Sequence, residues 1–273
     1  MLNIQGFNPS ASSIQRWKLD YLSNLIHSST LHYPIVAITE TWLKPFHSDA
    51  QVGIANYNVF RGDRVKREHG GTLLYVHQSI PVTSEERFDD DVCAAIFLTS
   101  KPTNVMVACI YKPCDASHQS FAKLLSFLDN CIKSFENSDK FTKIFVGDLN
   151  FPNMWTPGLV DLAAKSQSEQ ALNNFMTTNF LCQYVDVPTR ESNILDLFLT
   201  NNDRIVQHVK SEKHKLLSDH NLLEITVPQC EFKLPTRADS SRNDAKLVGF
   251  NALNLNKANY DEISKSLNEI NWE

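Results

Sequence analysis

The sequence predicts a layered α/β fold, and a helix followed by a buried strand near its start supports that prediction. Between Ser13 and Ser28, apolar residues recur at helical spacing, which indicates an amphipathic helix. The run Pro34–Thr39 is apolar and short, as in a central strand that is buried on both faces. This succession is typical of layered α/β proteins. With 273 residues, of which 42% are hydrophobic, the chain can form one large domain or two small ones.

The remaining elements are predicted in chain order from the same periodicities. A strand is expected almost at the terminus, within Met1–Asn8. The runs 92–99 and 105–111 are separated by a short turn, so we expect them to pair as antiparallel strands. Further strands are expected at 72–76, 143–150, 193–200 and 222–227, and helices at 120–135, 168–179 and 259–270.

The composition limits the classes of function. No segment resembles a membrane-spanning run or a signal peptide, so no membrane partner is expected. The six cysteines contain no Cys-x-x-Cys pair and several lie in apolar runs, which indicates reduced, buried residues of an intracellular protein. The formal net charge of −5 argues against broad electrostatic adhesion to nucleic acid, although a local basic face is compatible with it.

The stretch Lys143–Asn150 contains the first candidate site residues. Its apolar run is followed by Gly147, which we expect to break the strand, and then by Asp148 and Asn150. If the chain stays extended there, both side chains project to the same face. A carboxylate and an amide at the end of a buried strand suit a hydrated metal and a phosphate. Taken alone, a polar turn is the better interpretation of this stretch.

Other strand ends carry similar groups. Glu40 directly follows a buried strand, where a carboxylate needs a cation or metal to be tolerated. Asp196 interrupts an apolar strand and needs a hydrogen-bond donor, for which a histidine is one candidate. Asn3 and Tyr111 also lie at strand ends, where an ordinary solvent-facing residue and a packed ring are the alternative interpretations.

A basic stretch supplies candidate substrate contacts. Arg61, Arg64, Lys66 and Arg67 form the densest positive segment of the chain. A solvated hairpin loop and a phosphate-contacting loop explain it equally well.

Strand ends thus deliver carboxylates, amides, one imidazole and one phenol. Hard oxygen ligands without a Cys/His cluster favour Mg²⁺ or Mn²⁺ over zinc. The chain contains neither a His-Glu-x-x-His motif nor a Gly-x-x-x-x-Gly-Lys loop, which argues against zinc peptidases and nucleotide-binding loops. The complete set is Asn3, Glu40, Tyr111, Asp148, Asn150, Asp196, Asp219 and His220.

Seven segments carry a resemblance to a known family. They are Leu2–Asn8, Ile38–Leu43, Phe60–Arg64 with Gly70–Gly71, Tyr111–Pro113, Gly147–Asn150, Leu195–Phe198 and Ser218–His220. In this order and spacing the chain resembles the endonuclease/exonuclease/phosphatase superfamily, and within it the apurinic-type endonuclease domain of non-LTR retrotransposons of the Jockey and chicken-repeat kind. The resemblance covers residues 1 to about 228, and the seven segments together are specific, whereas Ser-Asp-His alone would be weak.

The resemblance implies a four-layered α/β sandwich, with two mixed β-sheets packed face to face and helices on the outside. It implies a magnesium-dependent endonuclease, with Mn²⁺ as a possible replacement, that nicks DNA and exposes a 3′ hydroxyl as a primer. Residues 229–273 resemble the linker, with a C-terminal helix, that leads to a reverse transcriptase. The expected partners are therefore DNA, that reverse transcriptase domain and the element RNA, and the expected place of action is the nucleus.

The resemblance also assigns roles at the site. Glu40, Asn3 and Asp219 would hold the metal. His220, oriented by Asp196, would act as general base or stabilise the pentacovalent phosphate, and both roles remain open. Asp148 and Asn150 would position or activate the attacking water and bind a phosphate oxygen, and Tyr111 would complete the shell. Arg61, Arg64 and Lys112 are the expected substrate contacts, together with Asn150.

Two departures from the family pattern bear on the site. Gln5 stands where family members often carry Asp or Asn, and Cys114 stands where many have Asn. Both affect metal affinity and phosphate contacts. The alternatives to a DNA endonuclease are a phosphodiesterase or phosphatase of the same fold that acts on lipid or inositol phosphates, and a catalytically inactive DNA-binding relic.

Overall fold

The structure, a computed structural model, describes residues 1–7, 13–28, 33–99, 104–135, 141–155, 166–214 and 216–228. These residues belong to one compact unit, which spans Met1–Leu234. The predicted linker and the predicted helix at 259–270 lie outside the described residues, so the domain boundary at 228 stays a prediction. None of the described helices is long and apolar enough to cross a membrane.

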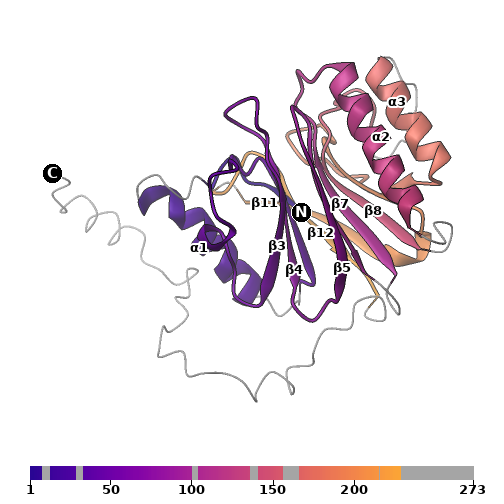
Figure 1. The fold of residues 1–273 in the computed structure, drawn as a ribbon. Helices are drawn as coiled ribbons and strands as arrows, with labels where there is room; N and C mark the ends of the chain where they lie inside the picture. The colour runs from indigo at the N-terminus through magenta and orange to yellow at the C-terminus, as the bar shows by residue number, and fades with distance from the viewer. Residues whose placement is uncertain are drawn as a thin grey trace. The chain divides into compact units, whose positions relative to one another are not determined.

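The described chain forms two β-sheets that face each other, with helices on their outer sides (Figure 1). The first sheet has the order β1-β2-β4-β3, in which β1 runs parallel to β2 and the other pairs are antiparallel. Its strands are β1 Leu2–Asn3, β2 Ile35–Thr39, β3 Tyr57–Gly62 and β4 Thr72–His77.

The second sheet has the order β5-β6-β7-β8-β10-β9. It is mixed, because β7 and β8 are parallel whereas the other neighbours are antiparallel. Its strands are β5 Val82–Asp89, β6 Cys93–Thr99, β7 Val105–Tyr111, β8 Thr142–Asp148, β9 Cys182–Gln183 and β10 Asp196–Thr200.

A two-stranded antiparallel ribbon completes the strands. It consists of β11, His208–Lys213, and β12, Asn221–Thr226. The backbone N–H of Leu223 in β12 donates to the carbonyl of Met1 at 2.9 Å, so the ribbon lies beside the first strand. Short 3-10 turns occur at Asp49–Gln51 and Asp203–Ile205.

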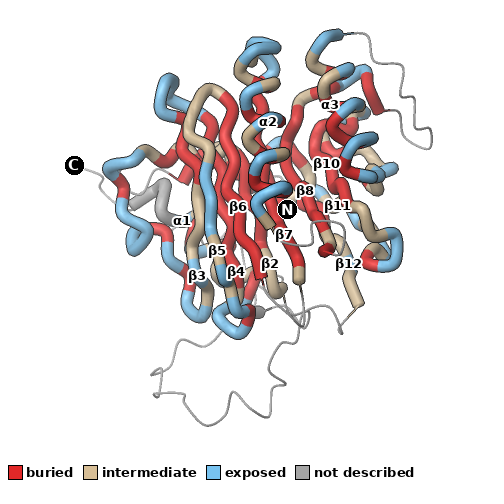
Figure 2. Tube along the Cα trace, turned by 45° about the vertical axis from the view of Figure 1, so that its right-hand side comes forward, coloured by how far each residue is buried: buried red, intermediate tan, exposed pale blue. Residues whose placement is uncertain are grey.

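The helices cover the outer faces of the two sheets (Figure 1). Helix α1, Ser13–Ser28, packs on the first sheet, where Leu22 lies in one apolar cluster with Ile38 of β2. Helices α2, His118–Ser134, and α3, Gln167–Thr178, pack on the second sheet and share the larger apolar cluster with the sheet interior. Ser117 and Ser166 cap these two helices through their side-chain oxygens. The strands β2, β4, β6, β7, β8 and β10 are buried almost throughout (Figure 2).

The predicted four-layered sandwich is therefore confirmed, and all three predicted helices within the described residues are present. The prediction that Gly147 breaks its strand is wrong, because β8 continues through Gly147 to Asp148. The glycine has a different role. A Cβ atom built on it would lie 1.8 Å from the carbonyl oxygen of Ile110, so the close approach of β7 to β8 requires glycine there.

Four strands, β3, β5, β9 and β11, were not predicted, and the side chains of β3 are mostly half-buried. The edge strand β5 is largely solvent-facing and carries Glu85, Glu86 and Arg87 in succession, so it shows no apolar alternation. The strand β9 is very short and β11 is half-exposed, so neither has an apolar pattern that predicts a strand.

Candidate active site

Strands of both sheets end at one edge of the molecule and present polar side chains there. Asn3 ends β1 and Glu40 follows β2 in the first sheet. In the second sheet Tyr111, Asp148 and Asp196 are aligned on the neighbouring strands β7, β8 and β10. Strand order therefore gathers side chains that lie far apart along the sequence.

The centre of this cluster is a buried histidine between two buried carboxylates. Asp148 and Asp196 are 1% exposed and His220 is 2% exposed. Nδ1 of His220 lies 2.7 Å from Oδ2 of Asp196, and Nε2 of His220 lies 4.0 Å from Oδ2 of Asp148. Because a carboxylate only accepts, Nδ1 carries the proton of a neutral imidazole and Nε2 keeps its lone pair toward Asp148. The 4.0 Å separation leaves these last two atoms without a direct hydrogen bond.

The electrostatics of the centre follow from its burial. Burial, followed by the negative charge of Asp196, raises the pKa of Asp148 from its ordinary value of 3.8 to about 8. Burial by itself lowers the pKa of His220, but the hydrogen bond and charge of Asp196, followed by the charge of Asp148, more than offset this, so the pKa of His220 is raised. The cluster therefore attracts positive charge, whether as a proton or as a cation.

Asn3 and Asn150 hold the carboxylate of Asp148 from two sides. Nδ2 of Asn3 donates to Oδ2 of Asp148 at 3.0 Å, and the backbone N–H of Asn150 donates to Oδ1 at 3.2 Å. Asn3 is 1% exposed, so the solvent-facing interpretation of this residue is wrong. The extended geometry expected for Asn150 is also wrong, because its φ is +50° and its amide donates to the carbonyl of Lys112 at 3.0 Å.

Glu40 is held by two donors. The hydroxyl of Tyr111 donates to Oε1 and the indole Nε1 of Trp42 donates to Oε2, both at 2.8 Å. Trp42 packs against the ring of His69 with centroids 4.3 Å apart, and a Cβ on Gly6 would lie 2.3 Å from the indole. The sequence analysis assigned no role to Trp42, although this residue lies two positions after Glu40 in the segment Ile38–Leu43.

Unusual backbone conformations surround this edge. Gln5, Glu40, Trp42 and Asn150 are non-glycine residues with φ values of +49°, +57°, +58° and +50°. Such left-handed conformations cost free energy and persist where the surrounding structure holds them, and they concentrate at functional sites.

Asp219 lies at the rim, next to His220. Its two carboxylate oxygens have different partners, because Nε2 of Gln5 donates to Oδ1 at 2.6 Å and Nη2 of Arg190 lies 2.6 Å from Oδ2. Gln5 also turns back into the site, where its backbone N–H donates to Oδ1 of Asn3 at 3.3 Å. Sequence reasoning missed Arg190 because a single arginine in a loop carries no distinguishing pattern.

The cations predicted to contact substrate have internal partners. Arg61 pairs with Asp49 at 3.0 Å and with Asp63 at 3.2 Å, and Arg64 pairs with Asp91 at 2.7 Å. The ammonium group of Lys112 is buried 4.3 Å from the centroid of the Phe151 ring, and burial lowers its pKa. A phosphate-contacting role for these side chains stays a prediction.

The donor set fits a divalent ion with hard oxygen ligands. The ligand atoms of Asp148, Asp196 and His220 all lie within 4.8 Å of one another. Oδ1 of Asp196 is buried and has no hydrogen-bond partner among the described residues. A buried carboxylate oxygen in this state, beside a second carboxylate, is the environment that a cation stabilises.

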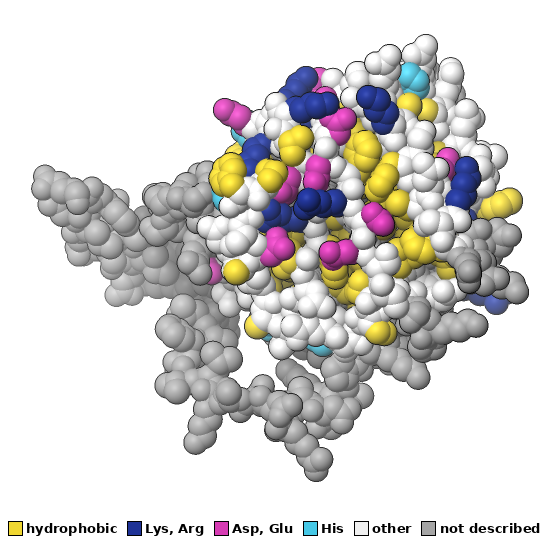
Figure 3. Space-filling model, in the orientation of Figure 1, with side chains coloured by type: hydrophobic (Ala, Val, Ile, Leu, Met, Phe, Trp, Pro, Cys, Tyr) yellow, Lys and Arg dark blue, Asp and Glu magenta, His cyan; other side chains and the backbone are white. Residues whose placement is uncertain are grey.

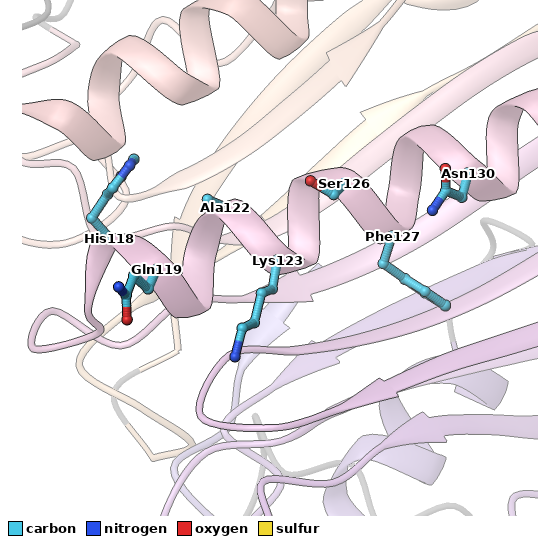
Figure 4. Close-up of a pocket in the computed structure, with 7 residues that line it drawn as sticks. All are labelled: His118, Gln119, Ala122, Lys123, Ser126, Phe127 and Asn130. Atoms are coloured by element: carbon cyan, nitrogen blue, oxygen red, sulfur yellow. The ribbon is translucent and has the colours of Figure 1, made fainter.

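A separate surface hollow of about 610 Å³ runs along α2. Figure 4 shows its lining side chains, among them His118, Lys123 and Phe127, along one face of that helix. None of the strand-end residues described above lines this hollow, so it does not contribute to the candidate site.

Comparisons with known proteins agree with this geometry. Residues 105–224, less than half of the chain, match the family model described as Endonuclease-reverse transcriptase. This match includes β7, β8, β10 and the first four residues of β12, together with Asp148, Asp196 and His220. No curated protein sequence matched the chain.

Solved structures share the fold at low sequence identity. The AP endonuclease LMAP from Leishmania major has a TM-score of 0.56 and 14% identity, and the match covers 82% of this chain and 85% of that one. A 3′ phosphatase from Neisseria, NExo, bound to a product DNA hairpin, has a TM-score of 0.58 and 13% identity, with 83% and 97% covered. A mannosyl-6-phosphatase from Bacteroides thetaiotaomicron has a TM-score of 0.54 and 11% identity, with 83% and 97% covered.

Identities this low support the fold rather than a shared substrate. The layered sheets agree with the fold of these solved structures, and the matched family model covers the strands that carry Asp148 and Asp196. Over residues 105–224 the chain is similar to the Endonuclease-reverse transcriptase family, and it shares its fold with the solved AP endonuclease and phosphatase structures.

Proposed function

We propose that this protein is a magnesium-dependent DNA endonuclease that nicks one strand and leaves a 3′ hydroxyl, from which a retrotransposon reverse transcriptase is primed. The convergence of Asp148, Asp196 and His220 from separate strands into one buried cluster carries the proposal. The Endonuclease-reverse transcriptase match over the same residues supports DNA as the substrate. The reverse transcriptase domain, the element RNA and the nucleus as the place of action are parts of this proposal.

In this proposal Asp148 acts on the attacking water and His220 acts on the phosphate. Asp148, held by Asn3 and Asn150, orients the attacking water and accepts its proton in the ionised state. With a pKa of about 8, the carboxyl reaches that state at mildly alkaline pH or when a bound cation lowers the pKa. His220, held by Asp196 through Nδ1, presents Nε2 to the phosphate. Because its pKa is raised, His220 is more protonated at neutral pH than an ordinary histidine, which favours stabilising the pentacovalent phosphate over acting as the base.

Glu40, Asn3 and Asp219 are the proposed metal-holding residues. Tyr111 and Trp42 orient Glu40, and the Oδ1 atom of Asn3 accepts the backbone N–H of Gln5. A bound Mg²⁺ ion, or Mn²⁺ in its place, neutralises phosphate charge and stabilises the leaving oxygen.

The surface is consistent with local rather than broad recognition of DNA. On the face turned to the viewer in Figure 3, basic side chains lie among acidic ones. With a formal net charge of −5, the chain depends on a few well-placed cations for binding a polyanion.

The test is nicking of supercoiled plasmid with Mg²⁺, Mn²⁺ or EDTA, followed by extension of the nick with a DNA polymerase. We expect wild-type nicks that the polymerase extends, and loss of nicking in Asp148→Ala and His220→Ala. The matched controls Asp186→Ala and His208→Ala change exposed residues outside the cluster and should nick normally. Full activity in Asp148→Ala or His220→Ala contradicts the proposal.

A phosphatase activity is the second candidate, because the mannosyl-6-phosphatase has the same fold. Release of inorganic phosphate from lipid or inositol phosphates, with intact plasmid in the same buffer, favours that activity. DNA binding without nicking in any of several metals favours an inactive relic.

A further inference from the structure

We propose that Arg190 binds a backbone phosphate of DNA beside the scissile bond, and that Asp219 and Gln5 hold it in place for that contact. This inference rests on the proposed function and adds to it a phosphate subsite that the sequence did not indicate. Its structural basis is a chain of contacts that joins the rim to the buried centre.

The chain of contacts runs through five residues and includes one backbone N–H group, that of Gln5. Arg190 pairs with Asp219 at 2.6 Å, and Asp219 accepts from Gln5 at 2.6 Å. The backbone N–H of Gln5 donates to Asn3 at 3.3 Å, and Asn3 donates to Asp148 at 3.0 Å. The position of the Arg190 guanidinium is therefore fixed relative to the carboxylate that is proposed to activate water.

Arg190 is accessible, whereas the cations predicted to bind substrate are not. Its side chain is 41% exposed, compared with 9% for Arg61 and 6% for Arg64. A guanidinium carries five N–H donors in a rigid fork that fits the oxygens of a phosphate. The ion pair with Asp219 uses Nη2, so other donors of the fork remain for a ligand.

The backbone beneath Arg190 is rigid. Thr189 is fully buried, and its hydroxyl oxygen accepts the backbone N–H groups of Leu195 and Asp196 at 3.0 and 3.1 Å. The carbonyl of Thr189 accepts the N–H of Asn221, the neighbour of His220, at 2.7 Å. Arg190 itself exchanges backbone hydrogen bonds with Asn193. The loop that carries the arginine is thus tied to both strands that supply the Asp196–His220 pair.

Two nearby carboxylates limit how strongly this subsite can attract a phosphate. Asp219 forms an ion pair with the guanidinium group of Arg190. Glu191, with a φ of +51°, directly follows Arg190 in the chain. Asp219→Asn removes the charge of Asp219 and keeps an oxygen that can accept from the guanidinium group, so it should strengthen binding of a phosphate while Arg190 stays in position. This expectation separates a phosphate contact from a purely structural ion pair, because breaking a structural pair from either side weakens the protein.

The experiment measures equilibrium binding of a fluorescent DNA duplex in EDTA over a series of KCl concentrations. We expect Arg190→Ala to bind roughly tenfold more weakly, as the loss of a charged hydrogen bond predicts. The slope of log affinity against log salt should become shallower by about one. Arg190→Lys should keep the slope and lose part of the affinity, because an ammonium group keeps the charge without the fork.

The matched control is Arg87→Ala, which removes an arginine that pairs with Asp89 at 3.2 Å on the edge strand β5. It should leave both affinity and slope unchanged. Asp219→Asn should bind DNA more tightly than wild type, and this gain should disappear in the Arg190→Ala background. If Arg190→Ala lowers the thermal midpoint of unfolding, the binding experiment uses Arg190→Gln instead, because glutamine keeps a hydrogen-bond donor for Asp219.

The proposal is overturned if Arg190→Ala and Arg190→Gln match Arg87→Ala in affinity and slope, or if no variant binds DNA at any salt concentration. A wild type that fails to nick with either metal, while Arg190→Ala still shows the shallower slope, contradicts the proposed endonuclease activity and leaves the phosphate contact supported. The two proposals therefore fail through different measurements.

Discussion

Nδ1 of His220 lies 2.7 Å from Oδ2 of Asp196, and both side chains are almost completely buried. The acid fixes the tautomer of the imidazole and so decides which nitrogen faces Asp148. Asp196→Asn removes that control while keeping size and shape. We expect kcat for nicking to fall about 10²- to 10⁴-fold with little change in KM for DNA.

The control for Asp196→Asn is Asp129→Asn, which alters an aspartate of α2 whose Oδ1 accepts from Asn179 at 2.8 Å. It tests whether loss of any comparable hydrogen bond slows the reaction. Equal effects of the two substitutions on kcat would count against a special role for Asp196.

Trp42→Phe tests the support of Glu40. The substitution keeps an aromatic ring and deletes the Nε1–H that donates to Glu40 at 2.8 Å. Because groups that orient a ligand affect metal affinity, the Mg²⁺ concentration for half-maximal activity should rise about tenfold. The Mg²⁺-induced increase in thermal midpoint should shift to higher concentration in parallel, which provides a readout independent of turnover.

Trp17→Phe is the control for that experiment, since Trp17 is 37% exposed on α1. An unchanged metal dependence in Trp42→Phe would show that Glu40 needs no indole to hold its position or that Glu40 does not ligate the ion.

Asp148→Asn should stabilise the metal-free protein at alkaline pH. The folded-state pKa of Asp148 is about 8 and the ordinary value is 3.8, so the folded protein retains a proton that the unfolded chain releases between these values. This carboxyl therefore destabilises the fold increasingly as pH rises from about 4 to 8. The raised pKa of His220 acts in the same direction, because its stabilisation is lost as pH rises through the folded-state pKa.

Thermal unfolding in EDTA at several pH values measures this effect. The midpoint of Asp148→Asn should exceed that of wild type at pH 8, and the difference should shrink toward pH 5. Added Mg²⁺ should raise the midpoint of wild type more than that of the variant. A pH-independent difference between the two would remove the electrostatic explanation.

Gly147→Ala should destabilise the fold strongly. The added methyl group would meet the backbone of β7, with the carbonyl oxygen of Ile110 only 1.8 Å away, and backbone in a central strand cannot move aside cheaply. We expect the free energy of unfolding in urea to fall by about 3 kcal/mol or more. Gly53→Ala is the control, since the nearest atom to its added Cβ lies 3.6 Å away. Similar losses in both would refute the steric explanation.

Sequence periodicity predicted the parts of the fold whose apolar pattern is strong. The three helices and the buried strands β2, β6, β7, β8 and β10 show that pattern. The edge strand β5 was missed, because three charged residues follow one another in it and it shows no regular apolar alternation. The face-to-face packing of the sheets came from resemblance, because strand order depends on contacts between distant segments.

The candidate site was predicted to the extent that strand ends identify it. Asp148, Asp196, His220 and Asn3 were singled out as polar residues beside apolar runs, and the structure places them together. Arg190 could not be found this way, because its significance comes from its position against Asp219 in another loop. The density of positive charge predicted Arg61 as a substrate contact instead. Its ion pairs with Asp49 and Asp63 become evident only in the folded structure.

The hydrogen bond between Leu223 and Met1 brings β12 alongside β1, so the cluster combines Asn3 with His220. During translation, a ribosome has therefore made almost the whole described domain before the last of these groups emerges. A nascent chain lacks the complete cluster until that late stage, and a product that terminates before His220 lacks the imidazole of the cluster. The topology thereby allows the cluster to assemble only in chains that extend past His220.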